Sequence, residues 1–68
     1  MRVLINGKPE EIGDAGTVGD LVRQFELVPR RIAIEVNEQL VPRDTYDDVV
    51  LAAGDRVEIV TFVGGGTP

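Results

Sequence analysis

Residues 1–12 read MRVLINGKPEEI, and this stretch decides how the fold begins. Met1–Ile5 is short and rich in branched apolar side chains, which is typical of a strand with a buried face. Asn6-Gly7 is a pair that accepts a positive φ at both central positions of a type I′ turn. The stretch therefore predicts a β-hairpin in which a second strand, Lys8–Ile12, returns antiparallel to the first.

A helical pattern follows the hairpin. Apolar side chains recur at i, i+3, i+4 and i+7, on one face of a helix, and we expect all four in the core: Val18, Leu21, Val22 and Phe25. Thr17 precedes Asp20 by three residues, an approximate capping box with an acid shorter than the preferred Glu. Pro29 is expected to stop the helix near Leu27, because the residue before a proline avoids helical geometry.

Strand patterns return in the second half of the chain. Ile32–Val36 alternates apolar and other side chains, which predicts a half-buried strand. A turn, a short strand, a helical turn or loop, and a last strand are then expected at Asn37-Glu38, Gln39–Val41, Arg43–Asp48 and Arg56–Val63. The strands and the helix are mixed without regular βαβ alternation. This order predicts an α+β domain with one helix laid across one sheet.

Composition excludes several classes of function. The 68 residues include no cysteine and no histidine, so cysteine nucleophiles, disulfides, the usual transition-metal ligands and the commonest general base are missing together. The formal net charge of −5 argues against nucleic acid as the main partner and favours a partner with a basic docking face. No apolar run approaches the ~20 residues of a membrane span, and no signal-peptide pattern opens the chain, so a cytoplasmic soluble protein is expected.

The acidic residues Asp44, Asp47 and Asp48 lack the spacing of a calcium loop, so we interpret them as a solvated turn and expect no metal site. On the last strand, Val60 and Phe62 fall on the face opposite Val57 and Ile59. If Val57 faces the helix, Val60 and Phe62 face solvent and form a small apolar patch suited to partner docking. The alternative, in which a bulge or strand twist buries Phe62, remains open.

The element order, with a glycine tail after the last strand, resembles the ubiquitin-like β-grasp proteins, and specifically the ThiS family of sulfur carriers in thiamine biosynthesis. The resemblance covers residues 1–66 and is carried by INGKP (5–9), IAIEVNEQLVPRDTY (32–46), AAGDRVEI (52–59) and TFVGGG (61–66). It implies a β-grasp domain over residues 1–63, with a mixed sheet of four to five strands, and a flexible tail over 64–68. The related MoaD-like carriers share the fold and the diglycine but typically reach it through a proline-containing segment unlike TFV.

The resemblance also implies a chemistry. In such carriers a ThiF-like enzyme, which itself uses ATP and magnesium, adenylates the C-terminal glycine carboxylate. Sulfur from a donor protein then replaces the adenylate, and a ThiG-like thiazole synthase receives it from the resulting thiocarboxylate. Gly66 would carry the sulfur, with Gly64 and Gly65 as the slender tail, and Arg43 within VPR would be a partner contact or a plain surface charge. The chain would be a monomeric cosubstrate that binds no cofactor of its own, and not an enzyme.

One departure from the family pattern follows Gly66. A carrier ready for activation ends at this glycine, whereas the sequence continues with Thr67-Pro68. Three explanations stay open: removal of the two residues by a protease, tolerance of them by the activating enzyme, or a protein that has kept only the fold. Removal is favoured because three intact glycines otherwise lack a use. A MoaD-like carrier, a ubiquitin-like modifier and a β-grasp binding module that does not use the tail stay open as alternatives.

Overall fold

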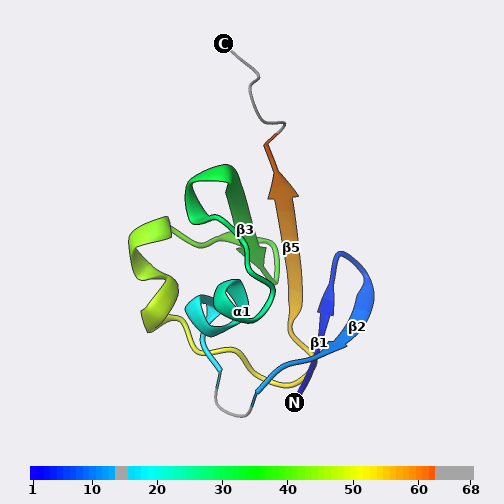
Figure 1. The fold of residues 1–68 in the computed structure, drawn as a ribbon. Coiled ribbons are helices and arrows are strands. Elements are labelled where there is room, and N and C mark those ends of the chain that lie inside the picture. The colour runs from blue at the N-terminus through cyan, green and yellow to red at the C-terminus, as the bar shows by residue number, and fades with distance from the viewer. Residues whose placement is uncertain (14–15, 63–68) are drawn as a thin grey trace.

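The structure, a computed structural model, describes residues 1–13 and 16–62. The elements in chain order are β1 (Arg2–Ile5), β2 (Lys8–Glu11), α1 (Val18–Gln24), the 3₁₀ turn η1 (Pro29–Arg31), β3 (Ile32–Val36), β4 (Gln39–Leu40), the 3₁₀ segment η2 (Arg43–Asp48) and β5 (Arg56–Thr61). The strands of the described residues form one sheet in the order β2-β1-β5-β3-β4, with β1 parallel to β5 and the other neighbours antiparallel. Helix α1 lies across one face of this sheet (Figure 1). The predicted α+β, β-grasp fold is confirmed.

Both predicted hairpin turns are present, and the backbone predicted for the first of them is confirmed. Asn6 and Gly7 have φ values of 51° and 82°, as a type I′ turn requires, and they place Ile5 opposite Lys8. The second turn, between β3 and β4, has φ values of 51° at Asn37 and 70° at Glu38. A positive φ is unusual at Glu38, since its Cβ crowds the backbone there.

The two turn asparagines also hold β5 through their side chains. The Asn6 amide donates from Nδ2 to the Ile59 carbonyl at 3.2 Å and accepts at Oδ1 from the Ile59 N–H at 2.7 Å. On the other side of β5, Asn37 Oδ1 accepts from the Arg56 N–H at 3.0 Å. The strand that is last in the sequence is therefore central in the sheet, and side chains from two hairpins continue its pairing beyond the backbone ladders.

The ends of helix α1 have separate local causes. Thr17 Oγ1 accepts from the Asp20 N–H and Asp20 Oδ2 accepts from the Thr17 N–H, each at 3.0 Å, so the predicted capping box is confirmed. At the other end Glu26 takes a φ of 55°, and the Leu27 N–H donates to the Val22 carbonyl at 2.9 Å. This is a Schellman motif, which ends the helix at Gln24. The prediction that Pro29 stops the helix near Leu27 was wrong, because the chain reverses before the proline is reached.

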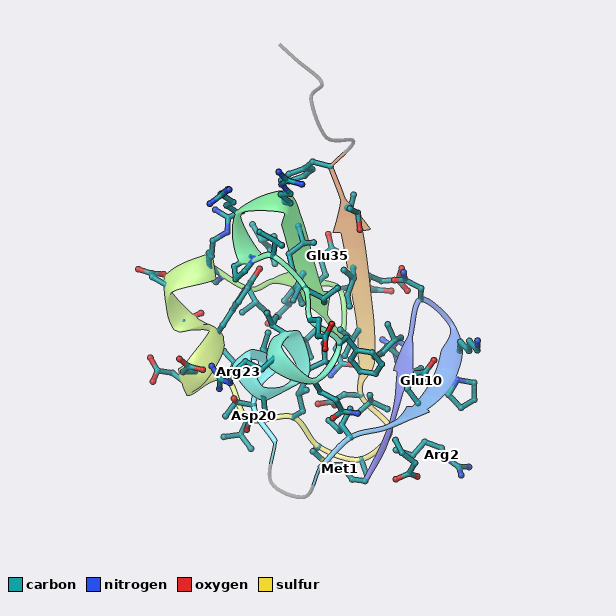
Figure 2. All side chains as sticks on the ribbon, in the orientation of Figure 1. Met1, Arg2, Glu10, Asp20, Arg23 and Glu35 are labelled. Carbon is teal, nitrogen blue, oxygen red and sulfur yellow. The ribbon has the colours of Figure 1, made fainter. Side chains whose placement is uncertain are left out.

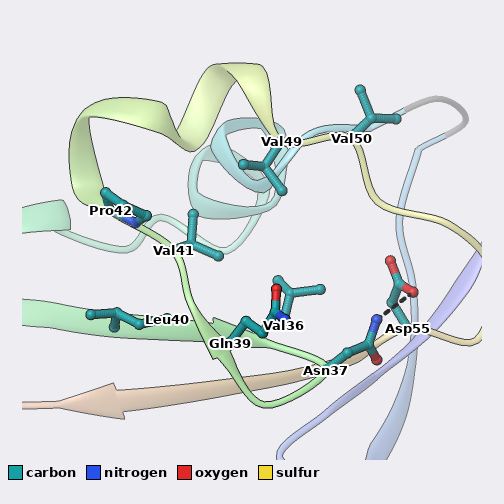
Figure 3. Close-up of a pocket in the computed structure, with 9 residues that line it drawn as sticks. All are labelled: Val36, Asn37, Gln39, Leu40, Val41, Pro42, Val49, Val50 and Asp55. Carbon is teal, nitrogen blue, oxygen red and sulfur yellow. Dashed lines mark hydrogen bonds between the residues drawn. The ribbon is translucent and has the colours of Figure 1, made fainter.

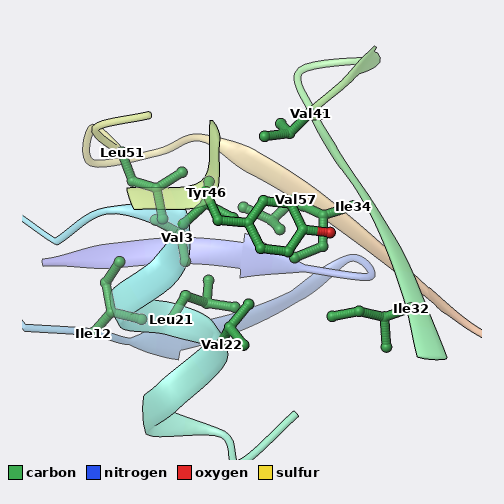
Figure 4. Packing of buried hydrophobic residues seen from close by; sticks show 11 residues of the cluster. Val3, Ile12, Leu21, Val22, Ile32, Ile34, Val41, Tyr46, Leu51 and Val57 are labelled. Atoms are coloured by element: carbon green, nitrogen blue, oxygen red, sulfur yellow. The ribbon is translucent and has the colours of Figure 1, made fainter. Parts of the chain in front are cut away.

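The core lies between α1, η2 and the inner face of the sheet (Figure 4). Its buried members are Val3, Ile12, Val18, Leu21, Val22, Ile32, Ile34, Val41, Tyr46, Leu51 and Val57. Three of the four predicted helix positions are buried, and the fourth, Phe25, is partly buried against the cluster. Tyr46 enters the core from η2, and nothing in the sequence pattern of Arg43–Asp48 predicted this.

Candidate functional site

The exposed end of β5 is the first part of the candidate site. Val57 is 1% exposed beneath the helix, whereas Val60 is 58% exposed and Phe62 is 49% exposed. Thr61 is also exposed, although alternation along the strand places it on the same face as the buried Val57, so β5 runs past the part of the sheet that the core covers. The structure therefore contradicts the alternative in which a bulge or twist buries Phe62. The predicted exposure of Val60 and Phe62 is confirmed.

Backbone hydrogen bonds hold β5 up to its last described residue. Thr61 pairs with Ile32 across the β3–β5 ladder, and the Phe62 N–H donates to the Arg31 carbonyl at 2.8 Å. The strand predicted over Arg56–Val63 ends at Thr61 in the structure. Val63 and the predicted tail, with Gly64, Gly65, Gly66, Thr67 and Pro68, lie outside the described residues.

The sheet face that α1 does not cover carries apolar and acidic side chains together. Val60 is paired with Ala33, and the exposed Leu40 lies opposite Glu35 on the same face. Glu35 and Glu58 lie directly opposite each other in the β3–β5 ladder, and both are exposed. Like charges at directly opposite positions destabilise a sheet, so this face is not arranged for stability alone.

Arg43, the third predicted docking residue, has a clear structural role. Its guanidinium donates from Nε to the Pro29 carbonyl at 2.8 Å and from Nη2 to the Ile32 carbonyl at 3.0 Å. These two bonds attach the start of η2 to η1, close to the end of β5. The side chain is exposed at the same time, so a partner contact by Arg43 stays a prediction.

The acidic residues of the predicted solvated turn do not gather around a cation. Asp47 pairs with Arg23 at 2.9 Å, and Arg23 also pairs with Asp20 at 3.0 Å. Figure 2 shows Arg23 and Asp20 beside each other. Hydrogen bonding to the Thr17 N–H, then to Arg23, lowers the pKa of Asp20. No group of three acidic, histidine or cysteine side chains suited to a metal ion occurs within residues 1–13 and 16–62.

A groove that the sequence did not predict lies at the opposite end of β5 from Phe62 (Figure 3). It runs between the β3–β4 hairpin and the segment 49–50, and its apolar walls include Leu40 and Val50. Its one acidic side chain, Asp55, accepts hydrogen bonds from the Asn37 amide at 3.0 Å and from the Ala52 N–H at 2.7 Å. Because the bonds of Asp55 are made within the fold, the groove offers no reactive group.

In the described part of the chain, no helix has the length and apolar character needed to cross a membrane.

Comparisons with known proteins agree with this architecture. The model of the ThiS family matches residues 3–66. The sulfur carrier protein ThiS of Bacillus subtilis is 38% identical over 53 residues, which cover 78% of this chain and 80% of that protein. The crystal structure of a thiamine biosynthesis protein (ThiS) from Geobacter metallireducens has a TM-score of 0.80 and 29% identity, and the match covers 97% of this chain and 100% of that one.

A longer protein is also similar. A thiazole synthase of Paramagnetospirillum magneticum is 36% identical over 67 residues, which cover 98% of this chain and 21% of the synthase. The chain thus spans about a fifth of the length of the thiazole synthases that it matches. The family match over residues 3–66, the five-stranded sheet and the likeness to a solved ThiS structure lead to one assignment. The chain belongs to the ThiS family.

Proposed function

We propose that the chain is a sulfur carrier for thiazole formation in thiamine biosynthesis, with the carboxylate of Gly66 as the group that carries sulfur. The carboxylate becomes reactive once Thr67-Pro68 has been removed. The observation that carries this proposal is the family match, which extends from residue 3 through the glycines to Gly66. The relative from Bacillus subtilis, named a sulfur carrier, supports the same function.

The chemistry needs little from the carrier itself. A ThiF-like enzyme, using its own ATP and magnesium, forms the acyl adenylate on Gly66 and releases pyrophosphate. A persulfide sulfur of a donor protein then displaces AMP, and a thiol reduces the resulting acyl disulfide to leave the thiocarboxylate. No histidine or cysteine of the chain is required, and it has none. The chain acts as a monomeric cosubstrate in the cytoplasm and is not a catalyst. A ThiG-like thiazole synthase as acceptor is supported by the two thiazole synthases that contain a similar segment.

The described end of β5 suits this role. Gly64–Gly66, if extended, reach about 10 Å, at roughly 3.3 to 3.6 Å per residue, so they can enter a narrow active site while the folded body stays outside. Ordering each glycine costs about 1 to 2 kcal/mol, so these residues contribute little net affinity. The binding free energy must come from the folded part, and among the described residues the exposed Val60 and Phe62 are the apolar side chains closest in sequence to the glycines.

The intact mass of the protein tests the proposal. The chain is incubated with a ThiF-like enzyme, ATP, magnesium, a sulfur source and a cell lysate that supplies the processing protease, and the expected product ends at Gly66 with one oxygen exchanged for sulfur. A matched chain that lacks Gly65 and Gly66 should show no such product. A chain made to end at Gly66 should react without the protease that the longer chain needs.

Each other outcome points elsewhere. Unmodified protein, under conditions that charge an authentic ThiS protein, would contradict the carrier function. A product joined through an isopeptide bond to a lysine of another protein would identify a ubiquitin-like modifier. If the chain without Gly65 and Gly66 keeps its full biological activity, the protein is a β-grasp binding module that does not use the tail.

A further inference from the structure

Three of the seven lysine and arginine residues meet at the end of the molecule where β5 ends. Arg30 and Arg31 belong to η1, and the Arg31 carbonyl accepts the Phe62 N–H at 2.8 Å. Arg43 lies over η1, because its guanidinium is bonded to the Pro29 and Ile32 carbonyls. Figure 1 shows the green η1 turn beside the arrowhead of β5. We call Arg30, Arg31 and Arg43 the basic end.

The backbone under the basic end is held in one geometry. Pro29 fixes its own φ at the first position of η1, and the Arg31 N–H donates to the Val28 carbonyl at 2.8 Å. The two bonds from Arg43 fasten the turn on its other side. Arg30 and Arg31 are therefore presented on a fixed support with exposed side chains, and a partner would not have to order this backbone on binding.

No carboxylate among the described residues pairs with the guanidinium groups of the basic end. Among the described residues, Arg23 is paired with Asp20 and Asp47, and Arg2 with Glu11, whereas no carboxylate pairs with Arg30, Arg31 or Arg43. Placing three guanidinium groups on adjoining segments without a counter-charge is unfavourable, because like charges repel one another. This arrangement occurs in a chain of net charge −5, which has twelve acidic residues available for pairing.

We propose that the basic end binds a carboxylate-rich protein surface around an apolar pocket on the enzyme that adenylates the carrier. The inference rests on the proposed function, because that enzyme must recognise the carrier before sulfur can be added. Guanidinium groups form paired hydrogen bonds with carboxylates, so Arg30 and Arg31 suit such a surface. Val28, 43% exposed, and Phe62, 49% exposed, are the exposed apolar residues whose backbones hydrogen-bond to the Arg31 backbone.

The distribution of charge orients the carrier as it approaches. An acidic partner surface repels the negative body and attracts the basic end, so the collisions that succeed bring residue 62, and the glycines after it in the sequence, towards the active site. The net charge alone favoured a partner with a basic docking face. The structure changes that expectation for the end of β5, where the local charge is opposite to the overall charge.

Association kinetics test the proposal with the full chain and a purified ThiF-like enzyme, without ATP. For the unaltered chain, the association rate constant should fall at least about tenfold between about 50 and about 500 mM NaCl. The double variant Arg30→Glu/Arg31→Glu should associate about tenfold more slowly at low salt and lose most of its salt dependence. The matched control Lys8→Glu/Arg56→Glu changes the net charge equally at exposed cations that form no ion pair among the described residues, and it should stay within about twofold.

Both variants should fold, since neither pair of side chains makes a hydrogen bond or ion pair within the described part of the chain. Their melting temperatures check this. Equal slowing of the two double variants, or none in either, would overturn the inference. The mass assay on the unaltered chain separates the two proposals. If that chain is charged and Arg30→Glu/Arg31→Glu associates normally, only the basic end is refuted; if it is never charged, the carrier function itself fails, whatever the kinetics show.

Discussion

Replacing Asn6 should destabilise the fold more than its exposed position in a turn suggests. The side chain makes two hydrogen bonds to the Ile59 backbone, at 2.7 and 3.2 Å, and each bond of this kind contributes about 1 kcal/mol. The backbone φ of 51° adds a second effect, because alanine tolerates the left-handed region less well than asparagine does, by about 1 kcal/mol. Asn6→Ala should therefore lower the free energy of unfolding by about 2 to 4 kcal/mol.

Two further variants separate these effects. Asn6→Gly removes both hydrogen bonds and relieves the backbone strain, but it makes the unfolded chain more flexible, so about 1.5 to 3 kcal/mol should be lost. Glu38→Ala is the matched control at the other hairpin, since Glu38 has a φ of 70° and its side chain makes no hydrogen bond within the described residues. Its unfolding free energy should change by less than about 0.5 kcal/mol.

Urea unfolding at equilibrium measures these differences, and amide hydrogen exchange localises them. The Ile59 N–H should exchange faster in Asn6→Ala than the overall loss of stability explains, because its acceptor has been removed. The reasoning is refuted if Asn6→Ala stays within about 0.5 kcal/mol of the unaltered protein. It is also refuted if Ile59 exchange changes no more than that of other core amides.

Three other changes test separate parts of the structure. Glu26→Gly should stabilise the fold by about 1 kcal/mol in urea unfolding, because Glu26 occupies the left-handed position of a Schellman motif, whereas Glu26→Ala should give no such gain. The pKa of Asp20 is lowered in the folded state, so the stability that its carboxylate contributes is present above the unfolded pKa and is lost as the pH falls through the folded pKa. The difference in unfolding free energy between the unaltered protein and Asp20→Asn should therefore shrink below about pH 4. A difference that stays constant with pH would contradict this. Phe62→Ala should weaken binding to a ThiF-like enzyme about tenfold with little change in melting temperature, and a large fall in melting temperature with normal activation would instead mean a core role.

Local signals explain why so much of the fold could be predicted. The Asn6-Gly7 turn and the Thr17–Asp20 capping box are specified by residues one to three positions apart, and both are confirmed. The alternation along β5 placed Val57 inside and Val60 outside for the same reason. In each case the conformation depends on neighbours that the sequence itself places together.

What the sequence missed depends on contacts between distant positions. Asn6 and Ile59 are 53 residues apart, so the turn pattern could indicate the φ at Asn6 but not the bonds of its side chain to β5. Tyr46 lies in a segment without strand or helix periodicity, and it is buried only because η2 packs on α1. The left-handed Glu26 carries no sequence signal, because glycine is the residue normally expected there.

The position of β5 links stability to the proposed carrier role. The strand lies between β1 and β3, is held by side chains from both hairpins, and is bonded to the Arg31 carbonyl at residue 62. A partner that binds at Phe62 therefore contacts the end of a central strand, paired on both sides, and not an edge strand. A partner can thus bind this end of the folded domain without unfolding it. Only the residues after Phe62 then need to enter the active site. Weakening the hold of Asn6 on β5 should thus impair activation only as far as it unfolds the domain, whereas changes at Arg30 and Arg31 should impair association in a domain that stays folded.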